Sequence, residues 1–426
     1  MGTAVRKPFR VVFGMNLATP TSQRHLRGVL RFAREHPDWT VSVVSRHDNG
    51  PVRADWSKLE ADGAFFDGFT PLEPLRREIR RRGLPVVASV AASDFRGRGV
   101  RIQCDNESVA RLAADHLASR GFSHFGFVGE ETEIRWSRIR LEAFRAALAS
   151  KGFACAAFPA PPESPATDPP RGVPAIAEWL AGLPKPVAVF AAFDLRARQV
   201  LDACREAGLA VPDDVAVIGV DDDPLLCETA DPPLSSVAMD VEDVAYAAAA
   251  ELDAMMRNKV SGGSLPDLPE KTLVVGAVRV AARASTARFI GRDRLVAKAR
   301  ALVETGTAGK LAVSDLAREL GVSRRTLETR FRAETGRSVG AAVLDARLAR
   351  AKDLLRTTTL PHEAVAAAVG ICSASHMASL FRRRLGARPS DFRGGGAPRQ
   401  PSVTSSVSNE PSSRTVKARS QGRPSL

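Results

Sequence analysis

Residues 313–332 read VSDLARELGVSRRTLETRFR, and residues 362–383 read HEAVAAAVGICSASHMASLFRR. In the first segment apolar residues recur at helical spacing on both sides of Gly321, which predicts two helices that meet at a tight turn. Ala317 is small enough to lie where the two helices cross, and Gly321 can adopt the positive φ that the turn requires. Ser323 stands where it can cap the second helix. The segment therefore predicts a helix-turn-helix unit.

The second segment repeats this pattern about 49 residues later. The equivalent positions are Ala317 and Ala366, Gly321 and Gly370, and, after one inserted residue, Phe331 and Phe381. A single match is typical of any helical hairpin with a glycine turn. Two matches in series, joined by a long helical stretch at 339–355, indicate paired DNA-reading units at 313–332 and 362–384.

The sequence after the second unit strengthens this interpretation. It reads FRRRLGARPSDFR, with a phenylalanine and basic residues, then Gly386, the turn residue Pro389, and finally Phe392 and Arg393. With the two units, this ending resembles the DNA-binding domain of the AraC/XylS type. The resemblance covers about residues 295–393 and implies that duplex DNA is a partner.

The side chains expected to face DNA lie opposite the apolar positions of each second helix. Arginines near the start of such a helix can bond the O6 and N7 atoms of guanine in the major groove. The alternative is a solvated basic face that contacts phosphates only. The second unit has fewer basic side chains on its exposed face, and we expect it to hold the protein on DNA more than to read the base sequence. The candidates are Arg324, Arg325, Thr326, Thr329 and Arg330 in the first unit, and Ser375, His376, Ser379, Arg382 and Arg383 in the second.

The charge of the chain is concentrated in the same region. The 426 residues carry a formal charge of +13, and residues 286–396 contain about 21 Lys and Arg against about 10 Asp and Glu. A local basic excess is typical of a DNA-binding module attached to a nearly neutral domain, although an arginine-rich genome composition gives a similar asymmetry. The five cysteines have no paired spacing, and no apolar run is long enough to span a bilayer. We therefore expect a cytoplasmic protein with reduced thiols, no metal, no cofactor and no membrane contact.

The first two thirds of the chain have a different pattern. From Phe9 to about Ala282, short apolar runs alternate with amphipathic helical stretches. Consecutively apolar strands, each followed by a helix, favour parallel sheets covered on both faces, and two such series predict two doubly wound lobes. The expected organisation is an α/β domain at 8–284, a linker at 285–293, the all-α DNA-binding domain at 294–394 and a disordered tail at 395–426. The proline-rich segment 159–172 is expected to be a surface loop.

In doubly wound folds, ligands bind beyond the carboxyl ends of the strands. This rule selects the polar residues Asn16, Asp67, Asp194 and Asp221, each at the end of a predicted strand or just after it. An aspartate in such a place can instead cap the next helix. That reading is favoured for Asp105, and for Asp222 both readings remain open.

Several motifs of this region resemble the sugar-binding regulators of the LacI/GalR type and, through them, periplasmic sugar-binding proteins. They include GFSHFGFVGEE, SRIRLEAFRAAL, VAVIGVDDDP and PPLSSVAMD. The resemblance implies that Arg140, Asp194 and Asp221 bind sugar hydroxyls. Carboxylates and guanidinium groups suit vicinal hydroxyls, and Trp136 can stack on a sugar face. The chain departs from the family at Phe193, where Asn is usual, and at Met239, where Gln is common, so the ligand pose is expected to differ.

The order of the two domains is itself informative. LacI-type regulators carry DNA-binding helices before the first strand, whereas this chain begins its first strand at Phe9 and has its DNA-binding pattern at the other end. This order resembles the xylose-operon regulator family of bacteria. The resemblance implies a homodimeric transcriptional regulator, an activator of sugar catabolism that contacts RNA polymerase, controlled by xylose or another monosaccharide bound between the lobes.

Two alternatives remain at this point. One is a DNA-binding regulator that responds to a ligand other than a sugar. The other is a sugar-processing enzyme with a basic accessory domain. The enzyme is disfavoured because the chain contains no phosphate-binding loop, no G-x-G-x-x-G after the first strand, no H-E-x-x-H and no G-x-S-x-G.

Overall fold

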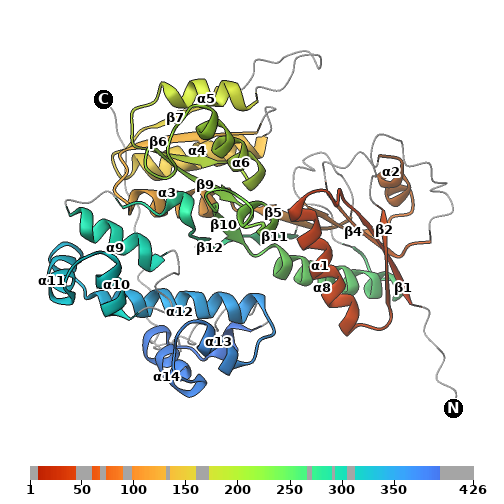
Figure 1. The fold of residues 1–426 in the computed structure, drawn as a ribbon. Helices are drawn as coiled ribbons and strands as arrows, with labels where there is room; N and C mark the ends of the chain where they lie inside the picture. The colour runs from red at the N-terminus through yellow and green to blue at the C-terminus, as the bar shows by residue number, and fades with distance from the viewer. Residues whose placement is uncertain are drawn as a thin grey trace, which may run out of the picture.

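A computed structural model shows two α/β lobes followed by an all-helical unit, coloured from red to blue along the chain in Figure 1. It describes residues 8–44, 60–67, 73–89, 98–130, 135–159, 172–265, 271–289, 293–304 and 312–393. Most of the proline-rich loop expected at 159–172 and all of the tail expected at 395–426 lie outside these ranges. The two-lobed α/β fold and the all-helical unit after it are confirmed.

The first lobe contains a six-stranded parallel sheet in the order β11-β5-β4-β3-β1-β2. Its strands are β1 (Phe9–Gly14), β2 (Trp39–Val44), β3 (Gly63–Asp67), β4 (Pro85–Ser89), β5 (Arg98–Cys104) and β11 (Lys271–Val275). The helices are α1 (Pro20–Glu35), α2 (Glu73–Arg81) and α8 (Val241–Val260). Apolar cores lie on both faces of the sheet, which explains why its central strands are apolar at consecutive positions.

The second lobe contains a sheet in the order β12-β10-β9-β8-β6-β7, parallel except for the β10–β12 pair. Its strands are β6 (His124–Val128), β7 (Cys155–Ala157), β8 (Val187–Ala191), β9 (Val215–Val220), β10 (Ser235–Met239) and β12 (Ala277–Ala281). The helices are α3 (Asn106–Ala118), α4 (Arg135–Ala149), α5 (Val173–Ala181), α6 (Asp194–Glu206) and the short α7 (Pro224–Cys227). This sheet also has a core on each face.

The chain passes between the lobes three times: from β5 to α3, from β10 to α8 and from β11 to β12. The three connections are hydrogen bonded to one another. Asp105 N donates to Val275 O over 2.8 Å, and Gly276 N donates to Asp240 Oδ1 over 2.6 Å. As a result α8 follows a strand of the second lobe but packs against α1 in the first (Figure 1).

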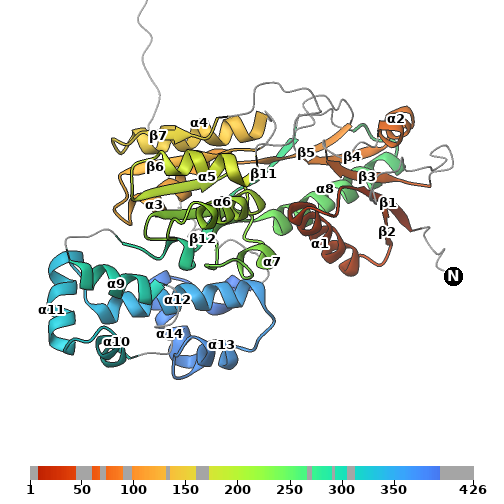
Figure 2. The same cartoon turned by 45° about the horizontal axis from the view of Figure 1, so that its top comes forward.

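Six helices and a final 3-10 turn form the helical unit, the part of the chain in which the sequence predicts a DNA-binding domain. They are α9 (Arg294–Glu304), α10 (Val313–Glu319), α11 (Arg324–Thr335), α12 (Val339–Thr357), α13 (His362–Ala368), α14 (Ala374–Leu385) and η4 (Pro389–Phe392). The unit has one core around α10 and α11 and another around α13 and α14, and the long α12 contributes to both. Figure 2 shows α12 running beneath the second lobe.

The first two residues of the expected linker at 285–293 pack in the second lobe. The 3-10 turn η2 (Ala284–Thr286) follows β12, and both Ser285 and Thr286 are fully buried in the second lobe. Ser285 Oγ donates to Val217 O, and the Thr286 hydroxyl pairs with Ser235 Oγ. These two residues complete the lobe, so a free connection to α9 can begin only after them.

Candidate effector site and DNA interface

The six residues expected to bind an effector come from both lobes. Asn16 follows β1, and its Oδ1 accepts a hydrogen bond from Ala18 N (3.0 Å), which shapes the turn before α1. Asp67 is the last residue of β3, and its side chain lies outside the described part of the structure. The other four, Trp136, Arg140, Asp194 and Asp221, lie in the second lobe.

Asp221 lies at a direct contact between the lobes. Thr21 Oγ1, at the start of α1, donates to Asp221 Oδ1 over 3.2 Å. Arg24, one helical turn later, donates to the backbone oxygen of Asp222 over 2.7 Å. Asp221 and Asp222 have φ values of 107° and 53°, the two positive values among non-glycine residues of the described chain. Such conformations cost on the order of 1–3 kcal/mol each and persist where surrounding contacts hold them, often at functional sites.

Arg140 on α4 is buried and is held from three directions. Its Nε donates to Asn106 Oδ1 over 3.0 Å, one terminal nitrogen donates to Ala192 O, and the other lies 3.5 Å from Cys104 Sγ. The guanidinium carbon lies 5.0 Å from the centre of the Trp136 ring. These partners come from the end of β5, the start of α3 and the end of β8, so Arg140 ties together the strand ends that border the interlobe contact.

An aromatic pair adjoins Arg140. The rings of Trp136 and Phe193 meet edge to face with their centres 6.1 Å apart. Both side chains are half-buried. Burial raises the pKa of Asp221, and the positive charges of Arg140 and Arg24 act in the opposite direction. An aromatic face, a fixed cation and a carboxylate are therefore grouped near the interlobe contact, and these are the groups that bind the faces and hydroxyls of a small polar ring.

Asp194 has a different environment from Asp221. It is buried, its Oδ1 accepts from Ser236 Oγ (2.6 Å), and its Oδ2 accepts from Asp223 N (2.9 Å) and Cys227 Sγ (3.3 Å). Burial, followed by the charge of Asp221, raises the pKa of Asp194 to about 8. Its contacts hold the turn after β9 in place, so Asp194 supports the neighbouring Asp221 structurally. Its binding of an effector stays a prediction.

Two of the residues considered as helix caps are now assigned. Asp105 caps α3, because its side chain accepts from Ser108 N over 2.9 Å. The cap of α7 is Asp223 and not Asp222. The carboxylate of Asp222 instead accepts from Arg279 and Arg283, at 3.0 and 2.7 Å.

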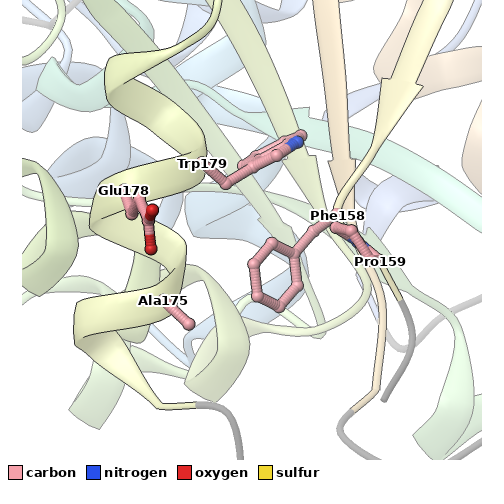
Figure 3. A pocket seen from close by; sticks show the side chains of 5 residues that line it. All are labelled: Phe158, Pro159, Ala175, Glu178 and Trp179. Atoms are coloured by element: carbon pink, nitrogen blue, oxygen red, sulfur yellow. The ribbon is translucent and has the colours of Figure 1, made fainter. Parts of the chain in front are cut away.

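A separate pocket lies on the second lobe. Its volume is about 420 Å³. It is lined by Ala175, Glu178 and Trp179 of α5 and by Phe158 and Pro159, which follow β7 (Figure 3). Four of the five lining side chains are apolar, and Glu178 alone is charged. None of the expected effector residues belongs to it, so we assign it no part in the effector site.

The first helix-turn-helix unit forms as its sequence predicts. Leu327 and Phe331 of α11 are buried together with Leu316 and Ala317 of α10. Gly321 at the turn has φ 67°, and Ser323 caps α11 by accepting from Thr326 N over 3.0 Å. The five expected DNA-facing residues of α11 are all exposed: Arg324, Arg325, Thr326, Thr329 and Arg330.

Arg330 differs from the other four. It forms an ion pair with Asp293, just before α9, and one of its terminal nitrogens lies 2.7 Å from Asp293 Oδ1. The arginine lowers the pKa of Asp293 below its usual value. Arg330 therefore braces α9 against α11. This contact joins positions 37 residues apart and has no local signal in the sequence.

The second unit repeats the geometry of the first. Gly370 has φ 70°, Ser373 caps α14 by accepting from His376 N over 3.1 Å, and Met377 and Phe381 are buried. The expected DNA-facing residues of α14 are exposed: Ser375, His376, Ser379, Arg382 and Arg383. The two units thus present two equivalent helices. The first begins with two arginines, and the second has its arginines in its last turn.

Within the described residues, no three His, Cys, Asp or Glu side chains gather in a way that suits a metal ion. No helix in the described ranges is both long and apolar enough to cross a bilayer.

Comparison with known proteins agrees with the two domains. Residues 114–286 match a periplasmic binding protein-like domain family, and residues 316–395 match a helix-turn-helix domain family. The xylose operon regulatory protein of Escherichia coli (strain K12) is 29% identical over 297 residues, which cover 68% of this chain and 73% of that protein. The corresponding protein of Haemophilus influenzae is 26% identical over 355 residues, covering 79% and 86%.

One solved structure shares the whole arrangement. It is described as the xylose-binding transcription activator xylR, and it covers 92% of this chain and 99% of its own length with a TM-score of 0.53 at 24% identity. At this identity the likeness shows the fold. The two domain matches and the relatives above agree with that arrangement, and this chain is an XylR-like transcriptional regulator: a periplasmic binding protein-like domain precedes an AraC-type helix-turn-helix domain, as in the xylose operon regulatory proteins.

Proposed function

We propose that this regulator is controlled by a small uncharged sugar that binds between the two lobes and alters how the helix-turn-helix units engage a promoter. The observation that carries the proposal is the group formed by Trp136, Arg140 and Asp221 beside the interlobe contact of Thr21. An aromatic ring and paired charged groups suit a ring with vicinal hydroxyls. The acidic side chain of Asp221 at this contact disfavours a phosphorylated ligand.

The proposal extends to the kind of sugar and the direction of control. The relatives in Escherichia coli and Haemophilus influenzae are named for the xylose operon, which makes a pentose the first candidate. Regulation by a ligand requires that it bind two conformations with different affinity. In this proposal the sugar favours the closed arrangement of the lobes in a homodimer, and the closed arrangement activates transcription through contact with RNA polymerase.

The DNA interface follows from the two exposed helices. We propose that Arg324 and Arg325 read base edges in the major groove, together with Thr326 and Thr329. Arg382 and Arg383, at the end of α14, contact phosphates and anchor the second unit.

Thermal melting of the full chain tests the effector. D-xylose, L-arabinose, D-ribose, D-glucose and glycerol are compared at equal concentration, because a ligand that binds the native state raises the melting temperature with the logarithm of its saturation. We expect a pentose to raise it and glycerol not to. Trp136→Ala should abolish the rise, and Trp136→Phe, which keeps an aromatic ring, should retain most of it. If none of the sugars shifts the melting temperature, the sugar effector is refuted.

Selection from random duplexes tests the DNA interface. The full chain should enrich a sequence pattern with two half-sites, one for each recognition helix. Variants Arg324→Ala and Arg325→Ala should lose preference at defined base positions in one half-site. Enrichment of no sequence by the wild-type chain would contradict base reading.

A further inference from the structure

The DNA-binding unit touches the second lobe at two places. At the first, Arg120 of α3 forms an ion pair with Glu304 of α9. Phe289 lies between two guanidinium groups there, 4.9 Å from that of Arg120 and 3.9 Å from that of Arg300. At the second, Arg279 Nε of β12 lies 2.8 Å from Asp353 Oδ1 of α12. Figure 2 shows α9 and α12 beneath this lobe.

The second contact continues into the effector side of the lobe. Arg279 uses another nitrogen to donate to Asp222 Oδ2 over 3.0 Å, while Arg283 donates to Asp222 Oδ1 over 2.7 Å. A guanidinium group has five donors in a fixed plane, so one arginine can hold two carboxylates only while both stay in that plane. Arg279 therefore joins Asp353 of the DNA-binding unit to Asp222, which directly follows the candidate effector residue Asp221.

The first lobe contacts the same two residues from the other side. Thr21 bonds the side chain of Asp221, and Arg24 bonds the backbone oxygen of Asp222. Both aspartates have positive φ, a conformation that is strained for a residue with a side chain and depends on such contacts. The peptide 221–222 thus meets the first lobe directly and the DNA-binding unit through Arg279.

The groups at this contact are largely shielded from water. The exposed side-chain fractions are 10% for Asp222, 25% for Arg279 and 19% for Asp353. Burial raises the pKa of Asp353, and the charge of Arg279 opposes that rise. Removing one partner from a shielded ion pair leaves the other charge poorly solvated, so this contact is sensitive to small displacements of Asp222.

Helix α12 is well placed to carry a displacement to both DNA-reading units. It packs into the core of the first unit through Val339 and Val343 and into that of the second through Leu348 and Leu355. Arg347 of α12 also donates to Gly370 O, at the turn of the second unit, over 3.0 Å. A shift of α12 relative to the lobe therefore moves both recognition helices.

We propose that Asp222 and Arg279 transmit the relative position of the two lobes to α12, and that the Arg279–Asp353 contact determines whether the DNA-binding unit is docked on the second lobe. When Arg24 and Thr21 move away, the peptide 221–222 relaxes, Asp222 leaves the plane of the guanidinium group, and Arg279 releases α12. The inference rests on the proposed function only in naming a sugar as the agent that moves the lobes.

A double-mutant cycle in the full chain tests the relay without any ligand. Amide hydrogen exchange is measured over α12 and β12 in wild type, Arg24→Gln, Asp353→Asn and the double variant. Each single change should speed exchange on the order of threefold to tenfold, as for the loss of one typical hydrogen bond. The double variant should exchange no faster than Asp353→Asn, because Arg24 acts on α12 through that contact. Asp202→Asn, which removes an exposed pair with Arg205 on α6, is the matched control and should change nothing.

Two results overturn the inference: exchange in α12 that is unchanged by Arg24→Gln, or single effects that multiply in the double variant. A second arm uses the sugar that gives the largest rise in melting temperature. Adding this sugar should alter amide hydrogen exchange in α12 of the wild type but not in α12 of Arg279→Gln. An equal change in both proteins also overturns the inference. If no sugar alters melting while the cycle behaves as described, the proposed effector fails and the relay stands.

Discussion

Replacing Gly219 by alanine should disrupt the effector side of the second lobe. Gly219 is in β9, two residues before Asp221, and an added Cβ would lie 2.3 Å from Asp194 Oδ1 and 3.1 Å from its Cα. Because part of the clash is with backbone, a change of rotamer cannot relieve it, and the first turn of α6 must move. Asp194 then cannot keep both of its bonds to Ser236 and to the backbone of Asp223, now 2.6 and 2.9 Å long.

The expected loss of stability follows from these contacts. Overpacking a buried site costs about 1–3 kcal/mol. A pKa of about 8 leaves Asp194 largely protonated at neutral pH, so each of its hydrogen bonds contributes about 0.5–1.5 kcal/mol. If Asp194 keeps one of its two short bonds, Gly219→Ala should lower the free energy of unfolding of the second lobe by about 1.5–4.5 kcal/mol. The rise in melting temperature that the sugar causes in the wild type should also be lost, because the turn that carries Asp221 is displaced.

Urea unfolding followed by tryptophan fluorescence measures the change, since Trp136 and Trp179 both belong to this lobe. Gly340→Ala is the matched control: Gly340 is in α12 and an added Cβ there would meet nothing within 4 Å. That variant should be neutral or stabilised by up to about 1 kcal/mol, the helix propensity gained. A Gly219→Ala protein within about 1 kcal/mol of wild type that still responds to sugar would refute the reasoning.

Three further predictions concern other parts of the chain. Burial raises the pKa of Asp194 from near 3.8 to about 8, so the protonated side chain contributes fully to stability below pH 4 and this contribution is lost as pH rises through 8. The free energy of unfolding in urea should therefore fall between pH 4 and 8 in the wild type and fall less steeply in Asp194→Asn. Parallel slopes in the two proteins would contradict this. Arg324→Ala or Arg325→Ala should lower discrimination between the selected duplex and a random one by about 1–3 kcal/mol in competition titrations, and equal loss on both duplexes would indicate phosphate contact instead. Arg383→Ala should weaken binding to all duplexes alike and reduce the slope of log affinity against log salt by about 1, whereas an unchanged slope would place Arg383 away from DNA.

The helical unit was predictable because its signals are local. Turn glycines, serine caps and apolar spacing lie within about twenty residues of one another, and Gly321, Ser323 and Phe331 have the predicted roles. The rule that ligands bind beyond the carboxyl ends of the strands also selected Asp221, which the structure places at the interlobe contact. It could equally have selected Asn106, which follows β5 and bonds Arg140.

The remaining features depend on contacts between distant parts of the chain. Arg24 and Asp222 are 198 positions apart, and no local pattern marks Arg24 as a partner of that backbone oxygen. Contacts of this kind are specified by how the lobes and the helical unit pack. The positive φ of Asp221 was equally hidden, because glycine is the usual signal for that conformation and the chain has none there.

The three crossings between the lobes affect how the protein is made. Neither lobe is a continuous stretch of chain, and the strands that complete the two sheets, β11 and β12, are synthesised after every other strand. Until residue 281 has left the ribosome, β5 and β10 each present an unpaired edge, the feature through which nascent chains most readily associate with one another. The helical unit, in contrast, is contiguous and has its own cores, so it can fold as soon as it emerges. Chaperone dependence during synthesis should therefore be concentrated in the α/β region and end when these two strands are in place.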